Sequence, residues 1–142
     1  FYEEDYRVVD VPVETPAGTA VVHVKTLPAE NRNVDNAIGR MLWDGEVLLG
    51  RRLAAMDLRG KSVIELGAGV GFAALCCGAA QRVVMSDLYD DIVAIERDNI
   101  ALNRDLIRRR SAALTASPRR GRHPRLVRRQ HRDGALRRRR RL

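Results

Sequence analysis

The sequence of 142 residues lacks several features that would assign a protein to a class directly. No apolar run is as long as a membrane span, so we expect none. The first residues, FYEEDY, are acidic, unlike the basic start of a signal peptide, and we therefore expect a cytoplasmic or nuclear location. Because the chain begins with Phe1 rather than methionine, we expect an N-terminus that is processed or incomplete.

Cysteine is also scarce. Cys76 and Cys77 are adjacent in an apolar stretch, and no companion ligands stand near them in the sequence. Adjacent residues of a helix point about 100° apart. This arrangement predicts neither a disulfide framework nor a metal site, and we interpret both cysteines as small core residues.

Charge is distributed unevenly along the chain. Residues 1–106 contain 11 Lys and Arg and 17 Asp and Glu, a net charge of −6, whereas residues 107–142 contain 15 Arg and one Asp, a net charge of +14. A change this sharp predicts a boundary near Leu106. We therefore expect a folded part at 1–106 and a disordered basic tail at 107–142. Within the folded part, we expect a hairpin and a linker at 1–35 and the main α/β segment at 36–106.

The most informative stretch is SVIELGAGVGFAALCCGAAQRVVMSD, residues 62–87. Ser62–Leu66 is a short apolar run of the kind found in inner parallel strands, and Phe72–Ala80 is an apolar helical segment. Arg82–Ser86 is a second apolar run, which ends at Asp87. Glycines in the turn between strand and helix leave no Cβ between the backbone and a ligand. An acidic residue after the second strand is suited to bind ribose hydroxyls.

The spacing of the glycines differs from that of a dinucleotide-binding turn. A dinucleotide fingerprint, G-x-G-x-x-G, would need glycine or alanine at position 72, which is Phe72. The sequence instead reads E-x-G-x-G-x-G from Glu65 to Gly71. The alternative is a glycine-rich turn that serves packing alone and binds nothing.

The remaining folded part predicts familiar elements. Tyr6–Val13 and Ala20–Leu27 are strand-like runs around a turn that contains Pro16 and Gly18, which predicts an antiparallel hairpin. A helical pattern, interrupted by glycines, covers residues 36–56, and Asp90–Leu102 predicts an amphipathic helix.

The order of these motifs resembles a known family. The E-x-G-x-G-x-G pattern is similar to motif I of the class I, seven-strand methyltransferases that use S-adenosylmethionine. The Trp43-Asp44 pair before it and the NIALN stretch at Asn99–Asn103 resemble the protein-lysine methyltransferase-like group. From the residues alone, Asn99 and Asn103 fit either a solvated helix end or a role in the site.

The resemblance implies a cofactor site for S-adenosylmethionine. Trp43 would line the pocket, and the backbone of Gly67, Ala68, Gly69 and Gly71 would contact the methionine portion. Asp87 would hold the ribose hydroxyls, and Glu65 would steady the glycine turn or the cofactor's amino group. The implied activity is methyl transfer to a lysine of a protein substrate. The resemblance identifies no catalytic residue.

The resemblance also implies an α/β, Rossmann-like fold with an N-terminal hairpin. Past Asp105 the sequence shows no apolar strand run, so we expect truncation after the second parallel strand and its helix, with the C-terminal half of the family's fold missing or replaced. One side of Ser62–Leu66 would then lack a neighbouring strand.

The arginine-rich tail leaves two interpretations open. It could be an arm on a non-catalytic remnant, which binds nucleic acid or other polyanions through phosphates. The alternative, which the abrupt change in composition favours, is GC-rich sequence read in the wrong frame or through an unspliced intron.

Overall fold

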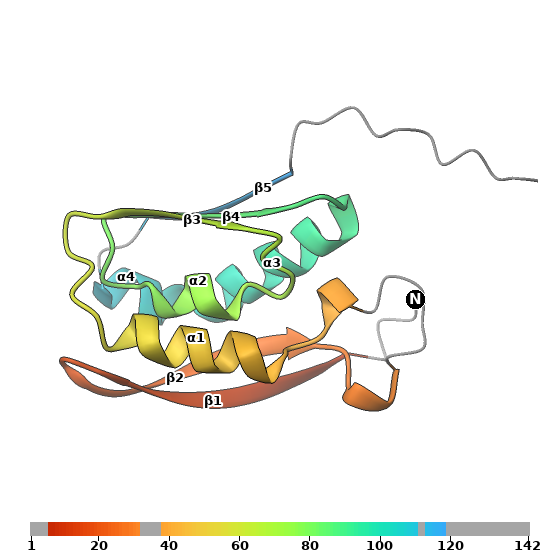
Figure 1. Ribbon diagram of the computed structural model, residues 1–142, viewed down its shortest axis with the longest axis horizontal. Helices are drawn as coiled ribbons and strands as arrows, with labels where there is room; N and C mark the ends of the chain where they lie inside the picture. The colour runs from red at the N-terminus through yellow and green to blue at the C-terminus, as the bar shows by residue number, and fades with distance from the viewer. Residues whose placement is uncertain (1–5, 32–37, 111–112, 119–142) are drawn as a thin grey trace, which may run out of the picture.

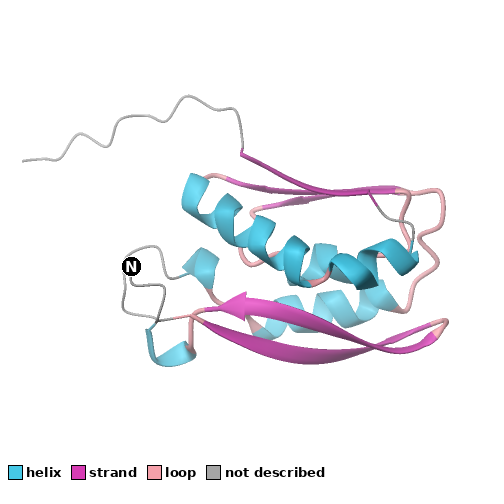
Figure 2. Ribbon diagram, turned by 180° about the vertical axis from the view of Figure 1, so that it is seen from behind, coloured by secondary structure: helices cyan, strands magenta, loops and turns pink. Residues whose placement is uncertain are grey.

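The computed structural model describes residues 6–31, 38–110 and 113–118. These residues form three layers: a β-hairpin, a layer of helices, and a three-stranded sheet (Figure 1). The view from behind shows the same order, with the helices between the hairpin and the sheet (Figure 2). The described helices therefore cover only one face of the three-stranded sheet.

Two sheets and four α-helices make up these layers. In chain order the elements are β1 (Arg7–Thr15), β2 (Gly18–Thr26), two 3-10 turns (Ala29–Asn31 and Ile38–Arg40), α1 (Asp44–Ala54), β3 (Ser62–Leu66), α2 (Phe72–Cys76), β4 (Arg82–Asp87), α3 (Asp90–Leu102), α4 (Arg104–Arg110) and β5 (Ala113–Pro118). No helix among the described residues is long and apolar enough to cross a membrane.

The predicted hairpin is confirmed. β1 and β2 pair antiparallel, with Arg7 opposite Thr26 at one end and Thr15 opposite Gly18 at the other. Gly18 has a positive φ of 111°, which its place after the turn requires. Val11, Val13, Val22 and Val24 turn inward at alternate positions and join the core. The valine side chains therefore hold the hairpin against the helical layer.

The three-stranded sheet is parallel, in the order β3-β4-β5. The strands β3 and β4 and the helix α3 lie where the sequence predicts them. Helix α2 ends at Cys76, earlier than expected, because the next turns use tight bonds from Cys77 N–H to Ala74 O and from Ala80 N–H to Cys77 O. Both cysteines are buried, as predicted.

The structure differs from the sequence expectation after Leu106. Helix α4 extends to Arg110 because Ile107 is buried and its N–H donates to Asn103 O. A third parallel strand, β5, then pairs with β4 over Ala113–Pro118. ALTASP has little strand character by itself, and its pairing with β4 and packing against α3 stabilise it there. Residues 119–142 lie outside the described residues, so the two interpretations of the tail remain predictions.

Two asparagines join α3 to the exposed edge of β2. Asn99 accepts a hydrogen bond from Lys25 N–H at 2.6 Å and donates to Lys25 O, and Asn103 makes the equivalent pair with the backbone of His23. Asn99 and Asn103 are four residues apart on a helix, a rise of about 6.0 Å, and Lys25 and His23 are two residues apart on a strand, a rise of about 6.6 Å. Because these distances are similar, each asparagine lies beside its own strand residue. Both side chains are buried, so the solvated helix end is wrong. Asn99 also donates to Val70 O in the glycine-rich turn at 2.8 Å, and a role in the site stays a prediction.

Candidate functional site

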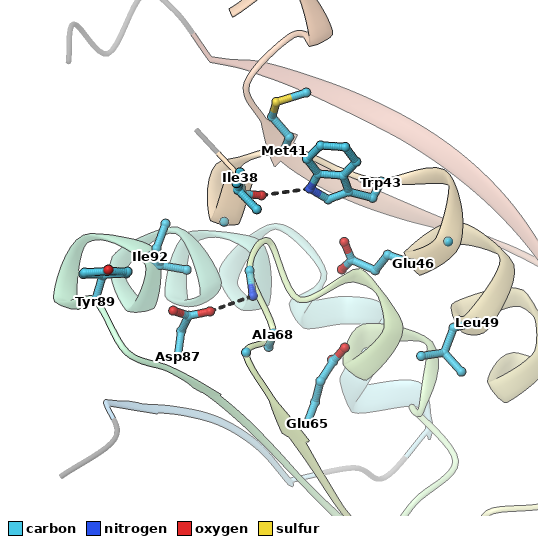
Figure 3. Close-up of a pocket in the computed structure, with 14 residues that line it drawn as sticks. Ile38, Met41, Trp43, Glu46, Leu49, Glu65, Ala68, Asp87, Tyr89 and Ile92 are labelled. Atoms are coloured by element: carbon cyan, nitrogen blue, oxygen red, sulfur yellow. Dashed lines mark hydrogen bonds between the residues drawn. The ribbon is translucent and has the colours of Figure 1, made fainter. Parts of the chain in front are cut away.

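A cavity of about 620 Å³ lies where β3 and β4 end and α1 begins. Ligands in open α/β sheets bind at this position, outside the carboxyl ends of the strands. The volume is within the usual range of small-molecule pockets, about 300–1,000 Å³. Its wall is formed by Ile38, Gly39, Met41, Trp43, Gly45, Glu46, Leu49, Glu65, Gly67, Ala68, Gly69, Asp87, Tyr89 and Ile92 (Figure 3).

The glycine-rich turn forms one side of the cavity. Gly67 and Gly69 have positive φ values of 69° and 56°, which favour glycine, and both line the cavity. The N–H groups of Gly67 and Ala68 donate to Ser86 O at 2.7 and 3.2 Å, which fastens the turn to β4. A Cβ added at Gly67 would meet no atom within 4 Å, so open space borders the backbone there.

Gly71 differs from the other two glycines. It is buried and does not line the cavity, and a Cβ built on it would lie 2.6 Å from the Met85 sulfur. Its φ of 79° also favours glycine. Gly71 therefore serves the packing of the turn against β4, and the cavity brings together the other six residues that the sequence analysis assigned to cofactor binding.

Asp87 lies at the end of β4 beside the turn. Its Oδ2 accepts a hydrogen bond from Gly69 N–H at 3.1 Å, drawn as a dashed line in Figure 3, and its Oδ1 accepts from Leu88 N–H at 2.6 Å. A carboxylate has about four acceptor positions, so Asp87 can hold the turn and still bind a ligand hydroxyl. The first of these two tasks could not be inferred from the sequence.

Two further carboxyl groups meet the first turn of α2. Glu46 Oε1 accepts from Phe72 N–H at 2.7 Å, and Glu65 Oε2 accepts from Ala74 N–H at 2.9 Å. Burial raises the pKa of Glu46 to about 7; the hydrogen bond from Phe72 opposes this shift, and the nearby Glu65 adds to it. Burial likewise raises the pKa of Glu65.

Trp43 stands at the other side of the cavity, directly before α1. Its indole N–H donates to Ile38 O at 2.8 Å, which fixes the ring over the cavity (Figure 3). The side chain stays 44% exposed, so Trp43 is a wall residue rather than a core anchor.

Glu46 was not among the site residues predicted from the sequence. It is the third residue of α1, where a glutamate commonly caps its own helix, and this explains the residue without a site. Its bond to Phe72, 26 positions along the chain, depends on how α1 packs against α2. Glu96 was missed too: it is fully buried on α3, and neither carboxyl oxygen has a hydrogen-bond partner among the described residues.

A parallel sheet, a glycine-rich turn after β3 and an acidic end to β4 define a Rossmann-like α/β domain with a cavity at the carboxyl ends of its strands. The family model described as lysine methyltransferase matches residues 23–116 of this chain. The chain belongs to that family, within the class I, protein-lysine methyltransferase-like group.

Curated relatives agree with the family model. The chain is 33% identical over 109 residues to methyltransferase-like protein 22 of Mus musculus, and the aligned region covers 73% of this chain and 26% of that protein. It is 34% identical over 89 residues to methyltransferase-like protein 22 of Homo sapiens, and that alignment covers 61% of this chain and 20% of that protein. The chain thus spans about a quarter or less of the length of these relatives.

Proposed function

We propose that the cavity binds S-adenosylmethionine and that this chain carries the cofactor-binding half of a protein-lysine methyltransferase. The observation that supports this best is the bare backbone of Gly67 and Gly69 on the cavity wall, with the Asp87 carboxylate beside it. The family match to lysine methyltransferases supports the class of reaction and of acceptor.

The residues present fit this cofactor. The cavity has room for a nucleoside joined to an amino acid, and its wall combines apolar groups with a few polar ones. The turn at Gly67–Gly69 would hold the amino-acid portion, Asp87 the ribose hydroxyls, and Trp43 would cover the ligand from the side of α1. When bound, S-adenosylmethionine supplies a methyl group on a sulfonium that a nucleophile displaces.

The protein's contribution to such a displacement is positional. Residues that fix the donor and exclude water bring it to near-attack geometry with an acceptor. Asp87 performs two parts of this task, since one carboxylate would orient the ribose while it fixes the Gly69 backbone. A lysine acceptor must lose its proton before it attacks. We assign that step to no residue of this chain.

The proposal is tested by calorimetric titration of the full chain with S-adenosylhomocysteine. We expect binding, and we expect Asp87→Asn to weaken it at least tenfold, because the amide keeps one acceptor oxygen but loses the charge-assisted bonds to ligand hydroxyls. Asp90→Asn is the matched control, since Asp90 is exposed at the start of α3 and does not line the cavity. Folded wild-type protein that binds neither S-adenosylhomocysteine nor S-adenosylmethionine would refute the proposal.

A further inference from the structure

We propose that Glu46 is a specificity-determining residue of this cavity, which favours a ligand with a positively charged sulfur over the same ligand with an uncharged thioether. The inference rests on the proposed function, because the two ligands are S-adenosylmethionine and its product, S-adenosylhomocysteine. It concerns a residue outside the glycine motif and the Trp-Asp pair.

The charges on the cavity wall all have one sign. Glu46, Glu65 and Asp87 line it, and no lysine, arginine or histidine is among its lining residues. Three backbone N–H groups at the turn and in the first turn of α2 are bonded to these carboxyl groups: Gly69 to Asp87, Phe72 to Glu46 and Ala74 to Glu65. A ligand with a net negative charge would therefore find no cationic side chain on the wall, whereas a ligand with an added positive charge gains attraction from each ionised carboxylate.

Glu46 lines the cavity with part of its side chain and holds the first turn of α2 with one carboxyl oxygen. With a pKa of about 7, its charge changes near neutral pH. Glu65 of β3 acts on Glu46 and raises its pKa, and Asp87 of β4 lines the same cavity; both are acidic. In the layer behind, burial and the nearby Asp87 and Glu65 raise the pKa of Glu96 of α3, which is also acidic. No cationic side chain of the cavity wall offsets the ionised form of Glu46.

A comparison of the two ligands isolates this effect. S-adenosylmethionine and S-adenosylhomocysteine share the nucleoside, the ammonium and the carboxylate, and they differ only in the methyl group and the charge on sulfur. Interactions with the shared groups largely cancel in the ratio of their dissociation constants. The ratio therefore measures the electrostatic preference for the sulfonium, and an ionised Glu46 increases it. The same preference would favour release of product after methyl transfer.

The test is calorimetric titration of the full chain with both ligands at pH 6 and pH 8. We expect wild-type protein to prefer S-adenosylmethionine more strongly at pH 8, because Glu46 ionises through about pH 7. In Glu46→Gln, we expect the preference at pH 8 to fall by roughly three- to tenfold and most of its pH dependence to disappear. Glutamine keeps an oxygen that accepts the bond from Phe72 N–H, so the first turn of α2 stays capped.

Asp44→Asn is the matched control. It removes one negative charge from the same turn of α1, but Asp44 is exposed and does not line the cavity. We expect its ratio to equal that of wild-type protein, since solvent screens an exposed charge. A fall in the ratio as large as that in Glu46→Gln would overturn the inference, because the preference would then follow net charge.

The outcomes separate the inference from the proposed function. If folded protein binds neither ligand, the proposed function fails. If both ligands bind and the ratio is the same in Glu46→Gln and wild type, the function stands and the inference fails. Should Glu46→Gln not fold, the wild-type measurements still decide, because a ratio that does not change between pH 6 and pH 8 contradicts a role for a group that titrates near 7.

Discussion

The two faces of the parallel sheet differ sharply. On the inner face, toward the helices, Val83 and Met85 of β4 are fully buried. On the outer face, Ile64 and Leu66 of β3 are 63% and 58% exposed, and no described helix covers them. β3 is also an edge strand among the described residues, as the sequence predicts.

The comparison shows which part of the molecule builds the site. The cavity draws on α1, the turn after β3 and the end of β4, all of which belong to the inner face or to the sheet's carboxyl edge. The hairpin closes the helical layer from the other side through the asparagine bonds of α3. The cavity therefore depends on the covered face, and the exposed Ile64 and Leu66 of β3 do not line it.

The largest effect should come from a deletion on the inner face. Met85→Ala removes a fully buried side chain that contacts the turn at Gly71, and we expect it to lower the free energy of unfolding by about 2–5 kcal/mol. Val84→Ala is the matched change on the same strand, since Val84 is only partly buried, and we expect about 1 kcal/mol or less. Urea unfolding followed by circular dichroism measures both; equal losses would contradict the difference between the two faces.

A smaller effect should come from the buried carboxyl group of the helical layer. Burial, with a contribution from Asp87, raises the pKa of Glu96 to about 8. The unfolded chain ionises near 4.5, so the folded state binds the extra proton between pH 4.5 and about 8, and stability falls as pH rises through that window. Glu96→Gln cannot ionise, and we expect it to be more stable than wild type by roughly 1–3 kcal/mol at pH 8.

The control for Glu96→Gln is the same comparison about one pH unit below the unfolded pKa of 4.5, where wild-type Glu96 is largely protonated in both states. There we expect the difference between the two proteins to be small. Thermal unfolding at several pH values measures it. A difference that does not change with pH would show that Glu96 ionises alike in the folded and unfolded chain.

Local pattern was enough to predict much of this structure from the sequence. Alternating valines predict the hairpin, and short apolar runs that end at glycine or aspartate predict β3 and β4. The residues that pattern missed depend on distant partners. Asn99 and Asn103 bond to a strand more than 70 positions away, and Glu46 of α1 accepts a bond from the first residue of α2. β5 is a strand because it pairs with β4. Tertiary contact decides such positions, and local propensity carries little information about them.

The smallest effect should come from the outer face itself. Ile64→Thr replaces an exposed β-branched residue by another, so the strand keeps a suitable residue and loses only exposed apolar surface. We expect the free energy of unfolding to change by about 0.5 kcal/mol or less. Val63→Thr, on the partly buried side of the same strand, is the matched control and should be more destabilising. Urea unfolding at two protein concentrations measures both variants. A loss of 2 kcal/mol or more for Ile64→Thr would show that this face is buried in solution, because an exposed side chain has no such interaction to lose.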